Sequence, residues 1–493
     1  MLEAEQFADL GGWDLDQQSM DQMGSPYLLA HGLGTPVLDA VTTVKFPEPG
    51  RYRVWVRTRD WVAPWKAPGT PGRFQVLING RPIKETFGTK GAEWHWQDGG
   101  LVEVAGEATI SLHDLTGFEG RCDAVLFCKD AQFNPPTELS ALTKFRRATL
   151  GLPEEPEDGG TYDLVVVGGG IAGTSAALSA ARQGLRVALV QDRPVLGGNG
   201  SSEVRVWPEG KTRQKPFPQI GAIVEELVLS KTAGAGNAKG KAFFADQRKL
   251  EAVRAEPRIT LLTEQHVNAV EVLDGRIQAV IAQHIRTARR ARLSARFFAD
   301  CTGDATVGFL AGADYEISKE GVMGSSNLWN LMDTSDPEQV LRCECKDKDA
   351  ISISVKEGTT VMPFPRCPWA IDLSNKPFPG RKSYKAQWAN TPLSNLGGWF
   401  WESGFDKDQV NDIERIRDLN FRAMYGAWDA LKNVDKLYPN HRIGWAAFIA
   451  GKRESRRLLG DVVLKGEDFR KGREFPDGCF PCTWGIDIHS PHP

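Results

Sequence analysis

Short stretches of alternating apolar and polar residues dominate the first 130 residues of the chain. Residues 51–57 alternate strictly, with Tyr52, Val54 and Val56 on one face. A period of two is typical of a strand that buries one face. Similar short apolar stretches return at residues 74–78, 108–112 and 124–128, separated by turns rich in Gly, Pro and Asp. We therefore predict an all-β sandwich over residues 1–130.

A different pattern follows a connector rich in Pro, Gly and charged residues, which we place at residues 131–161. The connector itself contains a predicted short helix over residues 138–150. Residues 163–167 then form a continuous apolar run, typical of a parallel strand buried on both faces. Glycines, a predicted helix over residues 174–183 and a second predicted strand over residues 185–190 come next. This order predicts an α/β Rossmann-like unit.

The glycines between the first strand and the helix suit a pyrophosphate group. Gly168 makes the tight turn, Gly170 lets the backbone approach the phosphates, and Gly173 lets the helix approach the strand. The N-terminus of the helix adds unpaired N–H groups and the positive end of the helix dipole. The predicted ligand is therefore a dinucleotide, bound by these glycines together with Ile171 and Ala172.

The residue after the second strand departs from the usual pattern. An acidic residue commonly stands there and binds ribose hydroxyl groups, whereas this chain has Gln191 followed by Asp192. The side-chain carbonyl of Gln191 can accept a hydrogen bond, but without the assistance of a charge. Asp192 is the alternative partner of the ribose.

Several segments resemble the glutathione-reductase-like FAD fold and the family of FAD-dependent oxidoreductases. Residues 192–202, which contain Gly197-Gly198, are similar to the second phosphate-side loop of that fold, and residues 294–304 resemble its later strand. Residues 454–461 and 485–489 resemble late segments of the family. The resemblance implies FAD as the cofactor and a redox activity. The cofactor site that we expect consists of Gly168, Gly170, Ile171, Ala172, Gly173, Gln191, Asp192, Arg193, Gly197, Gly198, Asn199, Gly200, Ser201, Val267, Cys301, Thr302, Gly303 and Asp304.

The N-terminal region resembles carbohydrate-binding-module-like β-sandwiches. The resemblance rests on Glu3-Ala-Glu5, on residues 49–54 and 106–112, and on Asp123. In such a domain, flat aromatic rings can stack on sugar rings. The alternative is that the tryptophans fill the sandwich or its contact with the next domain. The residues in question are Trp61, Trp65, Trp94 and Trp96.

These segments together predict a multidomain fold: an all-β sandwich followed by an α/β Rossmann-like FAD-binding domain with an inserted α+β substrate region. We place the sandwich at residues 1–130, the FAD-binding domain at 162–310, and the substrate region with an incomplete C-terminal part at 311–493. Such FAD folds close with a strand and a helix that faces the flavin, and nothing after Gly303 resembles them. We therefore expect a chain that is truncated relative to the family.

Oxidation of a hydroxyl-bearing carbon needs a base near the hydroxyl group. The catalytic candidates are Glu203 and Arg205, which follow the second glycine loop, and His489, with Asp487 beside it. The alternative for Glu203 and Arg205 is a salt-bridged pair that holds the loop. Three arginines in a helix-like stretch, at positions 453, 456 and 457, either bind a carboxylate substrate or form an ion-paired face.

The composition narrows the classes of partner. Charged residues make up 25% of the chain and the net charge is only −3, which gives no reason to expect a nucleic acid or an anionic membrane as partner. No stretch approaches the roughly 20 apolar residues of a membrane span, and the start shows no signal peptide, so we expect a cytoplasmic protein. The eight cysteines include the close pairs Cys343–Cys345 and Cys479–Cys482, whose spacing and context suit neither zinc nor redox motifs, and no metal site is expected.

Tryptophans are dense between residues 305 and 450, and such aromatics suit a sugar-lining pocket. Together with the sandwich, they favour an FAD-dependent oxidoreductase that acts on a carbohydrate or a related hydroxyl compound, with a small molecule as its partner. One alternative is a carbohydrate-binding protein with an incomplete, inactive flavin domain. Another is the same fold acting on an organic acid held by the arginines.

Overall fold

The alternating segments of residues 1–128 form antiparallel strands in the computed structural model, which describes residues 1–229, 237, 239–318, 322–342, 344, 361–381, 391–399 and 401–487. One sheet has the order β1-β11-β5-β8, a second has the order β4-β9-β6-β7, and a smaller third has the order β10-β3-β2. Side chains of both four-stranded sheets, among them Val54, Val76 and Ile110, meet in one core. The elements are β1 (Leu2–Glu3), β2 (Asp14–Asp16), α1 (Met20–Met23), β3 (Tyr27–Ala30), β4 (Ala40–Lys45), β5 (Gly50–Thr58), β6 (Phe74–Ile78), β7 (Arg81–Pro82), β8 (His95–Val104), β9 (Glu107–Asp114), β10 (Gly120–Cys122) and β11 (Ala124–Cys128).

Strand β5 is buried on both faces along its second half, whereas the alternation predicts one buried face. Trp55 and Arg57, on the face expected to be polar, are both buried. Trp55 packs in one cluster with Leu142 of helix α2 (Leu139–Leu150), the helix predicted within the connector. The connector therefore covers the outer face of this sheet instead of running freely between two domains.

The glycine-containing unit forms a six-stranded sheet with the order β14-β13-β12-β17-β16-β15. Strand β12 is parallel to both of its neighbours, and β15, β16 and β17 form an antiparallel meander. Ala177 and Leu178 of helix α3 pack on the sheet, because small residues let the helix come close. The elements are β12 (Glu157–Val167), α3 (Ile171–Arg182), β13 (Val187–Val190), α4 (Ala222–Leu227), α5 (Asp246–Arg254), β14 (Ile259–Leu262), β15 (Gln265–Leu273), β16 (Arg276–His284) and β17 (Arg290–Asp300).

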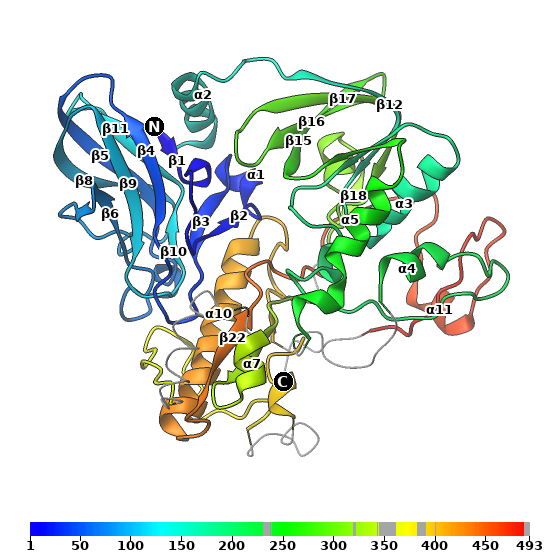
Figure 1. The fold of residues 1–493 in the computed structure, drawn as a ribbon. Helices are drawn as coiled ribbons and strands as arrows, with labels where there is room; N and C mark the ends of the chain where they lie inside the picture. The colour runs from blue at the N-terminus through cyan, green and yellow to red at the C-terminus, as the bar shows by residue number, and fades with distance from the viewer. Residues whose placement is uncertain are drawn as a thin grey trace.

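A long helix, α10 (Ile413–Asp429), lies below and between the N-terminal strands and the six-stranded sheet (Figure 1). None of the described helices is both long enough and apolar enough to span a membrane. The other elements are α6 (Thr306–Leu310), β18 (Tyr315–Glu316), β19 (Ser325–Ser326), β20 (Trp329–Asp333), α7 (Pro337–Arg342), β21 (Glu402–Ser403), β22 (His441–Ala446), β23 (Arg457–Leu458) and α11 (Gly466–Lys471).

Three of the tryptophans between residues 305 and 450 fill a hydrophobic core. Trp329, Trp369 and Trp428 are at most 5% exposed and share one cluster with Trp61 and Phe118 of the N-terminal region. The prediction that this density of aromatics marks a sugar-lining pocket is therefore wrong for these three residues. Trp388 lies outside the described residues. The shared cluster joins the N-terminal region to helix α10 through apolar packing.

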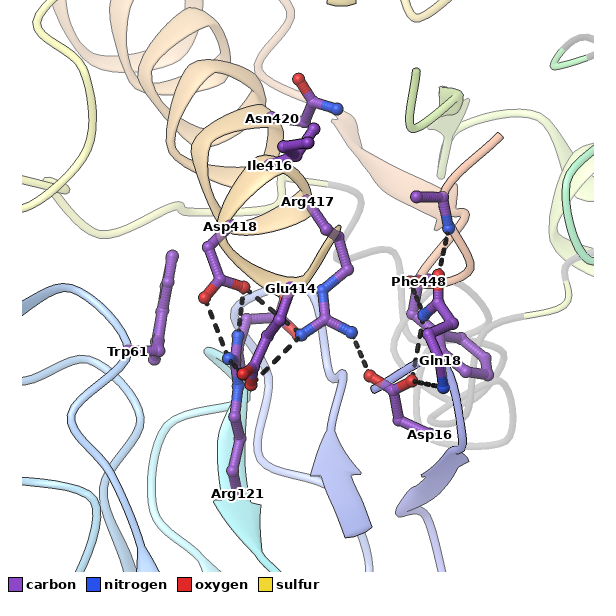
Figure 2. A network of polar contacts seen from close by, with 12 residues as sticks. Asp16, Gln18, Trp61, Arg121, Glu414, Ile416, Arg417, Asp418, Asn420 and Phe448 are labelled. Carbon is purple, nitrogen blue, oxygen red and sulfur yellow. Dashed lines mark hydrogen bonds and ion pairs between the residues drawn. The ribbon is translucent and has the colours of Figure 1, made fainter. Parts of the chain in front are cut away.

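A network of buried charges joins the same two parts (Figure 2). Nη1 of Arg121 donates to Glu414 at 2.6 Å and to Asp418 at 2.9 Å. Arg417, which lies in helix α10 like Glu414 and Asp418, forms an ion pair with Asp16 of strand β2. Burial alone would raise the pKa of the Glu414 carboxyl group, but the nearby guanidinium groups outweigh burial and hold that pKa well below its usual range. The charges are therefore paired, as buried charges must be.

Replacing one partner in this network tests its contribution to stability. We expect Asp418→Asn to lower the free energy of unfolding by about 3–5 kcal/mol, because Arg121 then keeps an incompletely paired buried charge. The matched control is Glu93→Gln, which removes an exposed ion pair with Arg415 of the same helix and should cost at most about 1 kcal/mol. Denaturant unfolding measures the free energy of unfolding of both variants. Equal small losses would contradict a stabilising role for the buried network.

Candidate active site

A cavity of about 530 Å³ lies at the carboxyl ends of strands β12, β13 and β17. This edge of an open parallel sheet is where α/β folds bind their ligands. Most of the residues predicted to bind the cofactor line this one cavity. They are Gly168, Gly170, Ile171, Ala172, Gln191, Asp192, Arg193, Gly197, Gly198, Asn199, Gly200, Val267, Cys301, Thr302, Gly303 and Asp304. Gly173 and Ser201 are not in the lining.

Two glycines of the first loop are needed for different reasons. A Cβ atom on Gly173 would lie 1.8 Å from the carbonyl oxygen of Gly168, so glycine is required there for helix α3 to approach the strand. Gly170 precedes the first residue of α3, and its φ of −63° is open to any residue. A Cβ atom on Gly170 would come no closer than 3.9 Å to its nearest neighbour. The fold therefore tolerates a side chain at Gly170, and only a ligand lying against the backbone would exclude it.

Gln191 holds the glycine loop through its side chain. Its Oε1 atom accepts a hydrogen bond from the Gly169 N–H group at 2.7 Å, and its Nε2 atom donates to the Val195 carbonyl at 3.1 Å. The carbonyl that we expected to accept from a ribose thus already accepts from the protein. Asp192, the next residue, brings a carboxylate to the cavity lining.

A buried lysine supports the second glycine loop, and nothing in the local sequence marks it. Lys249 of helix α5 is fully buried, and its Nζ atom donates to the carbonyl oxygens of Phe244 and Gly200. Burial lowers the pKa of this ammonium group. A Cβ atom on Gly197 would meet the Lys249 side chain at 2.9 Å. Ser201 is buried behind the loop, where its carbonyl oxygen accepts from the Arg205 N–H group at 2.9 Å.

A late segment of the chain, residues 449–455, contacts Asp304 and lines part of the cavity. Asp304 forms an ion pair with Lys452 and accepts a hydrogen bond from the Ser455 hydroxyl at 2.8 Å. Lys452 and Arg453 both line the cavity. From the sequence we found no closing strand and helix after Gly303, and the structure shows that Lys452 and Arg453 nevertheless reach the cavity wall. Residues 453–457 also lie outside any helix, in irregular chain that leads into strand β23, and so differ from the helix-like stretch we expected.

The predicted salt bridge between Glu203 and Arg205 is wrong. Glu203 lies 3.0 Å from Arg193, and Arg205 instead pairs with Glu344. The Arg205 guanidinium also stacks on Trp445, 3.6 Å from its ring centroid. Neither Glu203 nor Arg205 lines the cavity. Both side chains instead hold neighbouring groups in place.

The third catalytic candidate, His489, lies outside the described residues. Asp487, two residues before it, accepts a hydrogen bond from Arg453 of the cavity lining at 2.7 Å.

The cysteines of the described chain are free thiols, Cys479 and Cys482 among them. The pair Cys343–Cys345 lies outside the described residues. Within the described ranges, no group of three or more His, Cys, Asp or Glu side chains could hold a metal ion.

Substitution of Gly170 separates binding from folding. We expect Gly170→Ala to fold normally and to weaken FAD binding at least about tenfold, or about 1.4 kcal/mol, because the added methyl group blocks the approach of the pyrophosphate. Gly466→Ala, at an open position away from the cavity, is the control and should keep wild-type affinity. Flavin fluorescence titration measures the dissociation constants. Unchanged binding by Gly170→Ala would place the cofactor elsewhere.

The stability of the flavin-free protein should depend on the protonation of Glu203. Burial raises the pKa of Glu203 from its ordinary 4.5 to about 7, although Arg193 opposes the rise. A carboxyl group that binds its proton more tightly when folded contributes stability that is full below pH 4.5 and is lost as the pH rises through 7. Between pH 4.5 and 8, the free energy of unfolding should fall by about 3 kcal/mol more than in Glu203→Gln. Equal falls in denaturant unfolding would contradict this expectation.

Comparisons with known proteins bear on the family of the chain. The model of the FAD dependent oxidoreductase family matches residues 163–493. The aerobic glycerol-3-phosphate dehydrogenase of Staphylococcus aureus is 41% identical over 64 residues, which are 13% of this chain and 11% of the relative, so the match spans about a tenth of that protein.

Two solved structures show the level of structural likeness. The glycerol-3-phosphate dehydrogenase of Bacillus halodurans complexed with FAD is 18% identical, covers 38% of this chain and 43% of its own, and has a TM-score of 0.25. Sdh1 of Mycobacterium smegmatis is 16% identical over 34% and 41% of the two chains, with a TM-score of 0.27. On the family match over residues 163–493, the chain belongs to the FAD-dependent oxidoreductase family, and FAD is its cofactor.

Proposed function

We propose that this enzyme oxidises a small hydroxyl compound, a sugar or a related polyol, by hydride transfer to FAD. The observation that carries the proposal is the composition of the cavity wall. Besides the glycine loops, the lining contains the aromatic ring of Trp207 and the cations Lys452 and Arg453. An aromatic face suits the C–H groups of a sugar ring or polyol, and cations suit an anionic substituent on it. The short match to a dehydrogenase named for glycerol 3-phosphate supports the same class of compound.

Oxidation of an alcohol to a carbonyl compound removes a hydride from carbon and a proton from oxygen. FAD held by the glycine loops would supply the acceptor for the hydride, which carries the electron pair. The chain must supply a group that takes the proton. We assign that role to the segment containing Asp487 and His489, because Asp487 contacts Arg453 of the cavity lining.

Glu203 is better suited to a positioning role than to contact with the substrate. Its pKa of about 7 would suit a base at neutral pH, but its carboxylate lies against Arg193 and outside the cavity lining. Arg193 does line the cavity. We propose that Glu203 holds the Arg193 guanidinium in place beside the second glycine loop.

Glycan binding by the N-terminal region has less support. Three of the tryptophans considered for sugar stacking donate their indole N–H groups to protein acceptors: Trp61 to Phe118, Trp94 to Glu414 and Trp96 to Pro136. The ring of Trp65 lies under the Arg422 guanidinium. These contacts favour the alternative role, in which the tryptophans fill the region and its contact with helix α10.

Anaerobic reduction of the bound flavin tests the proposed substrate class. The purified chain should carry FAD, and its visible flavin absorbance should bleach on addition of at least one compound from a panel of sugars, polyols and phosphorylated polyols. Organic acids and amines serve as the comparison classes. The Gly466→Ala variant should bleach with the same compound at the wild-type rate. Bleaching by organic acids or amines alone would overturn the proposal.

A further inference from the structure

We infer that residues 17–24 of the N-terminal region form part of the FAD site, at its adenosine end, and that FAD binding and the contact of this segment with strand β15 strengthen each other. The starting observation is that Gln17, Gln18 and Asp21 line the same cavity as the glycine loops. The N-terminal region lies outside residues 163–493, which the family model matches, so the contribution belongs to this chain's own architecture. The inference requires FAD as the cofactor and does not depend on the substrate.

The position of Asp192 identifies the adenosine end of the cavity. Asp192 follows strand β13, where dinucleotide-binding folds place the residue that binds the ribose. The backbone N–H of Gln265 donates to the Gln191 carbonyl at 2.9 Å, which brings the start of strand β15 to the same place. His266 and Val267 of that strand both line the cavity. His266 is therefore a wall residue at the adenosine end.

Asp21 and His266 join the two parts of the chain at this wall. Nε2 of His266 lies 2.8 Å from Oδ1 of Asp21, across 245 residues of sequence. Burial alone would lower the pKa of His266, but the hydrogen bond to Asp21 and the charges of Asp21 and Asp192 outweigh it and raise that pKa, against the opposing charge of Lys452. Partial desolvation alone would raise the pKa of Asp21, whose side chain is 40% exposed, but the hydrogen bond and charge of the His266 imidazole outweigh it and lower that pKa. Each group therefore favours the charged form of the other.

Gln18 fixes a third part of the wall. Its Nε2 atom donates to the Phe448 carbonyl at 3.0 Å, and its Oε1 atom accepts from the Ala450 N–H group at 2.6 Å. Ala450 also lines the cavity, two residues before Lys452. A further hydrogen bond, from Gln283 of strand β16 to the Gly24 carbonyl at 3.3 Å, anchors the end of the segment. Residues 17–24 thus contact strands β15 and β16 and the late segment at once.

A ligand that contacts residues 17–24, strand β15 and the glycine loops stabilises the arrangement in which these segments are in contact with one another. Linkage requires the effect to be reciprocal: contacts that hold residues 17–24 in place strengthen FAD binding by the factor by which FAD strengthens those contacts. Loss of the Asp21–His266 pair should therefore appear as weaker binding of the cofactor. Binding of FAD should appear as slower opening of residues 17–24.

Flavin fluorescence titration of the full-length, flavin-free chain tests the first consequence. We expect Asp21→Ala to raise the dissociation constant for FAD about fivefold or more. The matched control, Glu93→Gln, breaks an ion pair between the N-terminal region and helix α10 whose residues are not in the cavity lining, and should leave the constant unchanged. Asp21→Ala combined with His266→Gln should lose little more than either substitution alone, because the two side chains act as a pair.

Amide hydrogen exchange of the wild-type chain tests the second consequence without any variant. FAD should slow exchange in residues 17–24 as well as in the glycine loops. Protection of the glycine loops alone, together with a wild-type dissociation constant for Asp21→Ala, would overturn the inference. Both readouts measure FAD binding, so they remain decisive if the proposed substrate class is wrong.

Discussion

The pairing of buried charges at the first turns of helix α10 is the interaction on which the arrangement of the molecule depends. Arg121, Arg417, Asp16 and Asp418 are all buried, and each of the two arginines contacts a carboxylate across the boundary between the N-terminal region and the helix. A buried guanidinium without its carboxylate is strongly unfavourable, so this network disfavours any placement of the strands on the helix that would separate the pairs. The apolar cluster around Trp61 adds non-directional attraction in the same place, whereas the ion pairs require particular residues to meet.

This attachment places residues of the N-terminal region in the wall of the cavity. Once strand β2 is held against α10 through Asp16, the residues that follow it are carried to strand β15, where Asp21 meets His266. The wall of the cavity is then built from three segments that are far apart in the sequence. The glycine loops bring backbone to this cavity, as a pyrophosphate site requires, and the N-terminal segment and residues 449–453 add side chains around them. A strand-rich region attached by a flexible connector would have no such role.

The sequence was sufficient for features that depend on local pattern. The run Asp163–Val167 predicted a strand, the glycines after it predicted a tight turn, and the small residues that follow predicted a helix. The structure has these three elements there. Features that depend on which distant residues meet could not be predicted in this way. Glu203 forms an ion pair with Arg193 rather than with Arg205. Lys249 donates a hydrogen bond to the second glycine loop, and Lys452 forms an ion pair with Asp304, each from a distant position in the sequence. The role of the tryptophans could not be predicted either, because composition does not distinguish the aromatic residues of a core from those of a pocket.

A crystal structure of the full chain with bound FAD is the most direct test of the central claim, that one cavity shared by these segments holds the cofactor. The account predicts the pyrophosphate against the backbone of Gly170 and the adenosine beside Asp192, with Asp21 and His266 in contact at the adjoining wall. FAD bound outside this cavity would contradict it. So would FAD bound in the cavity with residues 17–24 displaced from strand β15.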